Sequence, residues 1–163
     1  ARVHPNTKIL QPDPVFKEKF DQMDTYDKGA SKGSLTKRDK TSWSNKSWVL
    51  GVEDAGNSKT YDWNQLVVQR IIQDSIPNNP IVILLENDTA SFHTYSRIMN
   101  NDVLSFIKNK DAIWDTNTGS LWNYDGICIH GQLKGKVLTK VACYQEFLHS
   151  WEFFHPKSSR YGK

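Results

Sequence analysis

Short apolar runs separated by Gly, Asn and Asp recur along the chain from residue 47 onward. Ile81 to Leu85 is the longest of them. Between Phe92 and Ile98, by contrast, side chains alternate between two faces, which is the period of a β-strand. Runs of this length bounded by turn residues predict strands. We therefore predict strands at residues 47–53, 59–61, 81–85, 92–98, 103–107, 112–114, 120–122, 126–130 and 136–143.

Three segments have helical spacing instead. Asp13 and Pro14 have the residue types of an N-cap and a first helical position, and apolar residues follow at near-helical intervals up to residue 23. Residues 63–74 carry a one-sided apolar stripe that ends before Pro77, and residues 144–154 form a shorter segment that ends before Pro156. Together with the strands, these segments predict an α+β fold that is mainly antiparallel β, with about three peripheral helices.

The pattern divides the chain into three parts. Residues 1–46 read as an N-terminal arm, a helix and a loop rich in Gly, Ser and Lys, residues 47–156 as the α+β core, and residues 157–163 as a C-terminal tail. A chain of 163 residues is long enough to bury a sizeable core and fits a single domain.

Composition excludes two classes of function. The net charge is +3 and the basic residues are scattered, so we predict no nucleic-acid partner. The longest apolar run is far shorter than the ~20 residues of a membrane-spanning helix. No basic region followed by an apolar region opens the chain at Ala1, which fits a processed mature protein.

The two cysteines, Cys128 and Cys143, are not expected to bond each other. A hairpin turning at residues 131–135 would pair residue 128 with 138 and residue 123 with 143. The two sulfurs would then lie about 17 Å apart, at ~3.4 Å per residue. A disulfide needs Cα atoms within about 7 Å.

One segment carries a family resemblance. The run DTNTGSLW at residues 115–122 is followed by glycines at 126, 131 and 135, by Leu138, and by Trp151 with His155–Pro156. Upstream lie the V-L-G-V run at residues 49–52, Tyr61, Asp74, an apolar strand from Pro80, and Arg97. In this order the elements resemble the prokaryotic domain of unknown function number 3179 across residues 49–156. Because that family is largely exported, the resemblance implies an extracytoplasmic location, periplasmic or at the cell surface.

The resemblance also implies a site that this chain has altered. After its apolar strand the family has a C-x-x-C pair, which supports thiol redox or soft-metal chemistry. Here Glu86 and Thr89 stand at those two positions, and Gln69–Arg70 replaces the family's His–Glu. We therefore predict that thiol chemistry at this position is lost.

Two cofactor hypotheses remain beside a purely structural reading. Glu86 and Asp88 follow a strand and His93 lies on the next one, so the three could converge on a metal, or Asn87–Asp88 could simply be a hairpin tip. Haem ligation by His130, His149, His155 or Met99 is disfavoured, and a C-x-x-C-H attachment motif is absent from the sequence. No cofactor is predicted.

The sequence thus favours an exported, non-catalytic binding or accessory module, as a subunit of a larger envelope or electron-transfer assembly. Its partner would be a protein or a small ligand, and the oligomeric state stays open. The alternative is a metal-dependent enzyme, or a metal- or haem-binding redox partner, that uses Glu86, Asp88 and His93. We take as candidate ligand contacts Glu86, Asp88, His93, Arg97 and Trp122, and we expect the last of these to be buried.

Overall fold

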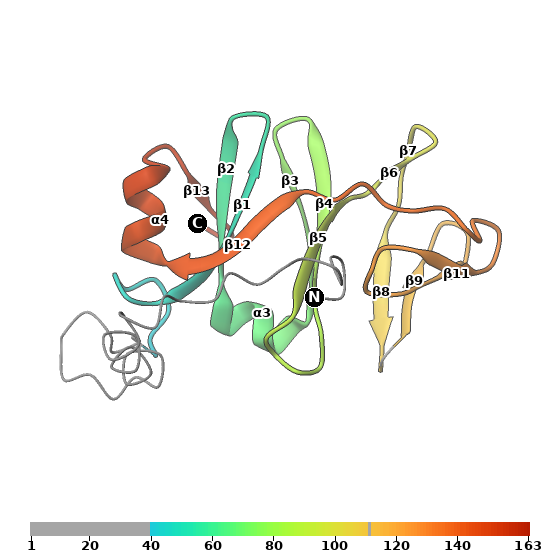
Figure 1. Cartoon of the computed structure of the whole chain (residues 1–163), viewed down its shortest axis with the longest axis horizontal. Coiled ribbons are helices and arrows are strands. Elements are labelled where there is room, and N and C mark those ends of the chain that lie inside the picture. The colour runs from blue at the N-terminus through green and yellow to red at the C-terminus, as the bar shows by residue number, and fades with distance from the viewer. Residues whose placement is uncertain (1–39, 111) are drawn as a thin grey trace, which may run out of the picture. The chain divides into compact units, whose positions relative to one another are not determined.

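A computed structural model describes residues 40–110 and 112–163. The elements in this part of the chain are mainly antiparallel strands in small sheets (Figure 1). The first sheet has the order β12 (Ala142–Phe147), β1 (Trp48–Asp54), β2 (Asn57–Asp62) and β13 (Ser159–Arg160). β13 is parallel to β2 and belongs to residues 157–163, which the sequence assigned to a tail.

Two further sheets follow in the middle of the chain. The second sheet has the order β3 (Ile71–Ile76), β4 (Asn79–Leu85) and β5 (Phe92–Ser96). The third has the order β11 (Cys128–His130), β10 (Leu121–Trp122), β9 (Ala112–Asp115) and β8 (Phe106–Asn109). A two-stranded hairpin of β6 (Ile98–Met99) and β7 (Asp102–Val103) connects the second sheet to the third in sequence.

Strand β4 lies at the centre of the packing because both of its faces are buried. Ile81, Ile83 and Leu85 belong to one core cluster, together with residues of β1, β2 and β3. Val82 and Leu84 belong to a second cluster, together with residues of the third sheet. This double burial explains why the run at residues 81–85 is continuously apolar rather than alternating.

Two helices, α3 (Trp63–Gln69) and α4 (Leu148–Phe154), lie in the described residues, not the about three expected. The helix predicted to begin at Asp13–Pro14 falls outside those residues. Neither of the two described helices is long and apolar enough to cross a membrane.

The helix predicted over residues 63–74 is wrong in its second half. Asp62 caps α3 by accepting a hydrogen bond from the Gln65 amide at 3.0 Å. Arg70 then takes the left-handed conformation, with φ of 63°, and its amide donates to the Leu66 carbonyl. The chain turns there into β3, whose β-branched isoleucines fit a strand that pairs with β4 along its whole length.

The helix predicted over residues 144–154 is also shorter than expected. Residues 144–147 complete β12, which pairs with β1 from Trp48 to Glu53. The Trp48 and Phe147 rings stack at 4.2 Å in this pairing. Cross-strand pairing with β1 therefore prevails over helical spacing, and α4 begins at Leu148.

Candidate functional site

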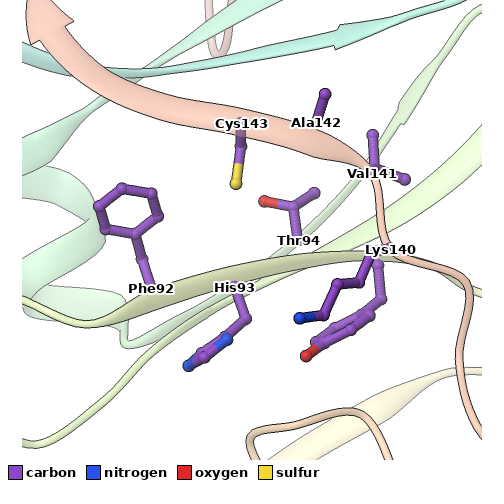
Figure 2. A pocket seen from close by; sticks show the side chains of 8 residues that line it. Phe92, His93, Thr94, Lys140, Val141, Ala142 and Cys143 are labelled. Carbon is purple, nitrogen blue, oxygen red and sulfur yellow. The ribbon is translucent and has the colours of Figure 1, made fainter. Parts of the chain in front are cut away.

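A groove opens where two paired strands separate. The Ser96 amide donates to the Thr139 carbonyl, and the Val141 amide donates to the Thr94 carbonyl, each at 2.9 Å. From Ala142 onward the chain pairs with β1 instead, so β5 and β12 diverge. The space between them has a volume of about 350 Å³ and is lined by Phe92, His93, Thr94, Tyr95, Lys140, Val141, Ala142 and Cys143 (Figure 2).

The two sides of this groove carry different kinds of side chain. Figure 2 shows Phe92, Thr94 and Cys143 on one side of the β5 ribbon and His93 with the Lys140 side chain on the other. This separation follows from the alternation of side chains along β5. One side of the groove is therefore mostly apolar, with a thiol and a hydroxyl, and the other carries ionisable groups.

The Cys143 thiol is partly buried in the groove. Burial raises the pKa of Cys143, and it outweighs the Thr94 hydroxyl, the Thr94 amide and the Lys140 charge, which all act in the opposite direction. The thiol is therefore protonated at neutral pH and is a poor nucleophile. Cys143 and Cys128 are both free thiols, as expected.

The hairpin register behind that expectation is wrong, however. Residue Ile127 is opposite Val137 in an isolated bridge, and Cys143 is opposite Val52 in the first sheet. The two cysteines therefore belong to different sheets. This separation rests on the long-range pairing of β12 with β1, which a local hairpin argument does not include.

Thr94 presents an unused polar group at the same place. The residue is 2% exposed, and its side-chain oxygen has no hydrogen-bond partner among the described residues. The Cys143 thiol, a weak hydrogen-bonding group, interacts with this hydroxyl. A buried hydroxyl without a partner costs free energy, so a ligand atom in the groove that accepts a hydrogen bond would remove that cost.

Glu86 and His93 form the ionisable pair beside the groove. Nε2 of His93 lies 2.7 Å from Oε1 of Glu86, and both side chains are mostly buried. The Tyr95 ring lies parallel to the imidazole, with ring centres 6.3 Å apart. The structure thus brings together two of the three side chains proposed as metal ligands.

Asp88, the third of them, is engaged within its own loop. Its carboxylate accepts hydrogen bonds from the Ser91 hydroxyl at 2.7 Å and from the Ala90 and Ser91 amides at 2.9 Å each. These bonds lower the pKa of Asp88 to about 2. In residues 40–110 and 112–163, no group of three or more His, Cys, Asp or Glu is placed to hold a metal ion.

Two of the three histidines considered for haem have other partners. His149 donates to the Asn45 carbonyl from Nδ1 at 2.7 Å. His155 lies 2.9 Å from the Tyr144 hydroxyl and stacks on Trp151 with ring centres 3.9 Å apart. His130 lies in β11 of the third sheet.

Arg97 and Trp122 do not line the groove. Nη1 of Arg97 donates to the Leu104 carbonyl at 3.0 Å and to Gln73 Oε1 at 3.3 Å. Burial lowers the pKa of Arg97, and the charge of Asp74 opposes that shift. Trp122 is 2% exposed in the second core cluster, as expected. Trp122 thus serves packing, whereas Arg97 is held by hydrogen bonds, and its Nε has no partner among the described residues.

The DTNTGSLW run is a turn held by its own side chains. Asp115 accepts hydrogen bonds from the Thr118 amide and hydroxyl and from Nε1 of Trp122 at 2.8 Å. The Ser120 hydroxyl accepts one from the Leu133 amide at 3.2 Å. The most specific motif in the sequence therefore has a structural role in this turn.

Sequence reasoning found His93 but missed Thr94, Lys140 and Cys143 as its neighbours in the groove. Each lies in a stretch that reads as an ordinary strand, and they are brought together by the bridge between Tyr95 and Lys140. Pairing across more than 40 residues leaves no local signal in a single sequence.

Comparison with known proteins gives one relationship. The family model described as protein of unknown function (DUF3179) matches residues 1–158, nearly the whole chain. The protein belongs to this family, as the motif order indicated. Neither the curated proteins nor the solved structures gave a match.

Proposed function

We propose that this protein is an exported, non-catalytic binding module, and that the groove between β5 and β12 holds a small organic anion. The observation that carries this proposal is the composition of the groove. An apolar wall, one buried hydroxyl without a partner and a lysine ammonium border a space of about 350 Å³. Small-molecule sites commonly combine mostly apolar walls with a few placed polar groups.

The positive charge of Lys140 favours an anionic ligand in this groove. Glu86 and His93 bind each other, whereas Lys140 has no ion-pair partner within the described part of the chain. A carboxylate near Lys140 would gain a charge-assisted contact. Its hydrocarbon part would have to reach from Lys140 across β5 to the apolar side of the groove, where Phe92 contributes a ring. The high pKa of Cys143 fits a thiol that serves as a wall of the site rather than as a nucleophile.

The position of the groove supports an accessory role. Glu86 and Thr89, which stand where the family resemblance places a thiol pair, follow β4 directly, and Glu86 reaches His93 at the groove. In this chain a groove therefore lies beside the position of the replaced pair. We therefore place the protein in an envelope or electron-transfer assembly, as a subunit that binds a ligand there.

Benzoate tests the proposal because it joins one carboxylate to one ring. Titration followed by amide chemical shifts should move Thr94, Val141 and Cys143, and the neutral analogue benzamide should bind at least fivefold more weakly. Lys140→Met should weaken benzoate binding at least fivefold, and Lys134→Met, at an exposed lysine of the 131–135 turn, should leave it unchanged. Equal binding of benzoate and benzamide, or shifts confined to other residues, would refute an anion site in this groove.

The Glu86–His93 pair favours one rival function, a metal-dependent activity. A hydrogen-bonded carboxylate and imidazole could each bind Zn²⁺, although the oxygens of Asp88 are already used in its loop. Stoichiometric Zn²⁺ in the isolated protein, lost in Glu86→Ala but kept in Asp102→Ala, would establish this rival in place of the non-catalytic module.

A further inference from the structure

Two phenylalanine side chains are exposed side by side at the end of α4. Phe153 is 79% exposed and Phe154 is 68% exposed, and their rings meet edge to face at 5.2 Å. The inner face of the same helix is already occupied, because Leu148 and Trp151 are buried against Val49 of β1. In the described part of the chain the Phe pair therefore presents an apolar surface that packing does not use.

Basic residues follow this pair in the sequence. After α4 the chain turns back, with the Ser158 amide donating to the His155 carbonyl and Nε1 of Trp151 donating to the Ser158 hydroxyl. This turn holds Lys157 next to the end of the helix. Residues 148–163 contain three basic side chains, Lys157, Arg160 and Lys163, and one acidic side chain, Glu152, so their net charge is 3 − 1 = +2 with His neutral.

The arrangement leaves Lys157 available for a partner. Glu152 is paired with Arg160, so the acidic charge of this region is already neutralised. Lys157 is exposed and forms no ion pair with the residues that the structure describes. A surface that covers the two rings would therefore meet at least one unpaired cation, which selects a negatively charged partner.

The size of the apolar surface distinguishes a lipid from a protein as that partner. Two phenylalanines can bury at most about 300–500 Å². A stable protein interface needs about 800 Å² on each side with an apolar centre. Aromatic side chains that insert at a membrane surface need less, since nearby cations add electrostatic attraction to anionic lipids.

We propose that the end of α4 docks on an anionic lipid surface, with Phe153 and Phe154 inserted at the interface and Lys157 beside the lipid phosphates. The attachment is peripheral and reversible, because two rings and a few cations bind far more weakly than a spanning helix. The proposal is independent of the ligand in the β5–β12 groove. It would place a binding module at a membrane surface.

Sedimentation of the full chain with lipid vesicles tests the proposal. At low salt the protein should bind vesicles that contain phosphatidylglycerol and phosphatidylcholine, and it should bind pure phosphatidylcholine at least fivefold more weakly. Phe153→Ser/Phe154→Ser should reduce binding to the mixed vesicles at least fivefold, and Lys157→Glu about threefold. Val68→Ser removes an apolar side chain that is 82% exposed on α3 and should have no effect.

All substituted side chains are exposed, so each variant should fold, and far-ultraviolet circular dichroism checks this. A change in vesicle binding then reports the surface and not a loss of fold. Binding that is lost in the Phe variant and kept in Val68→Ser supports the lipid surface. Wild-type protein that stays in solution with the mixed vesicles overturns the proposal and leaves the Phe pair to a protein partner. Equal binding by the wild type and the Phe variant overturns it as well.

Discussion

Several buried polar side chains in this protein lie where a neighbour completes their hydrogen bonds. Asp115 is 1% exposed and accepts from both Thr118 and Trp122. Buried carboxylates that keep such donors avoid the cost of desolvation without a partner. Thr94 departs from this pattern, as do Oδ1 of Asp62 and Nε of Arg97, because these buried atoms have no hydrogen-bond partner among the described residues. The Asp115 turn is therefore held by complete hydrogen bonds, whereas the groove contains a buried hydroxyl without one.

At the residue scale, Trp122→Ala should destabilise the protein by about 3–5 kcal/mol, the usual cost of emptying a large aromatic site. The indole packs edge to face with Phe106 in the second core cluster. Trp122→Phe keeps most of that packing and removes only the hydrogen bond to Asp115, so it should cost about 1–3 kcal/mol. Urea denaturation of both variants measures the difference. Similar midpoints for Trp122→Ala and the wild type would contradict the packing role.

Asp88 should titrate well below an ordinary carboxyl. Its pKa is lowered from 3.8 to about 2 by the Ser91 hydroxyl and by the Ala90 and Ser91 amides. Because the folded pKa is the lower one, the stabilisation is present above about pH 4 and is lost as pH falls from 3.8 towards 2. Carboxyl ¹³C shifts followed against pH measure this midpoint. Ser91→Ala should raise it, whereas Ser150→Ala, whose hydroxyl binds Glu146, should not.

Some residue roles were predictable from the sequence and others were not. The burial of Trp122 could be predicted because a tight turn and a large aromatic residue are both local features. The loop role of Asp88 was also open to prediction as a hairpin tip. The unpartnered Thr94 could not be predicted, because its environment is created by β12, a segment more than 40 residues away.

At the element scale, side chains substitute for backbone pairing between sheets. Gln73 of β3 accepts from the Phe106 amide at 2.7 Å and donates to the Phe106 carbonyl at 2.9 Å. One amide side chain thus makes the two hydrogen bonds that a neighbouring strand would make. It joins the second sheet to the edge of the third, where β8 has no strand partner on that side.

Gln73→Ala should therefore destabilise the protein by more than a surface substitution does. It leaves the amide and carbonyl of the buried Phe106 without these partners, and one such group costs about 1–3 kcal/mol. Gln69→Ala, at an exposed position in α3, should change the free energy of unfolding by less than about 0.5 kcal/mol. Chemical denaturation compares the two. An equal effect of both substitutions would show that water replaces Gln73 at no cost.

The element types themselves followed from local pattern where the pattern had a single meaning. The run at residues 81–85 predicted a buried strand, and β4 is buried on both faces. The helical spacing after Trp63 continued past Arg70, although the backbone there reverses into β3. Periodicity did not locate this boundary because the isoleucines of β3 also fit a helical stripe. Only the pairing of β3 with β4 decides between them.

At the scale of the whole molecule, family motifs that are distant in sequence meet in space. Gly51 comes from the V-L-G-V run, and Trp151 comes from the W-x-x-x-H-P run 100 residues later. A Cβ on Gly51 would lie 2.0 Å from the Trp151 ring, which is closer than any real contact. The glycine is therefore required because α4 packs its tryptophan directly on the backbone of β1. The order of motifs in the sequence indicated the family. This contact gives a physical reason for two of those motifs, the V-L-G-V run and the W-x-x-x-H-P run.

Gly51→Ala should destabilise the protein through Trp151 specifically. Overpacking of this kind costs about 1–3 kcal/mol or more, because either the ring or the strand must move. In a Trp151→Leu background the ring is gone, so Gly51→Ala should cost at least about 1 kcal/mol less than in the wild type.

Gly56→Ala serves as the control, since a Cβ there meets nothing within 4 Å and only its positive φ of 77° opposes the change. That substitution should cost the same in both backgrounds. Urea denaturation of the four Gly51 and Trp151 variants closes the cycle. Gly51→Ala could instead lower the free energy of unfolding equally with leucine and with tryptophan at position 151. In that case the strand alone requires the glycine, and the contact between the two motifs does not.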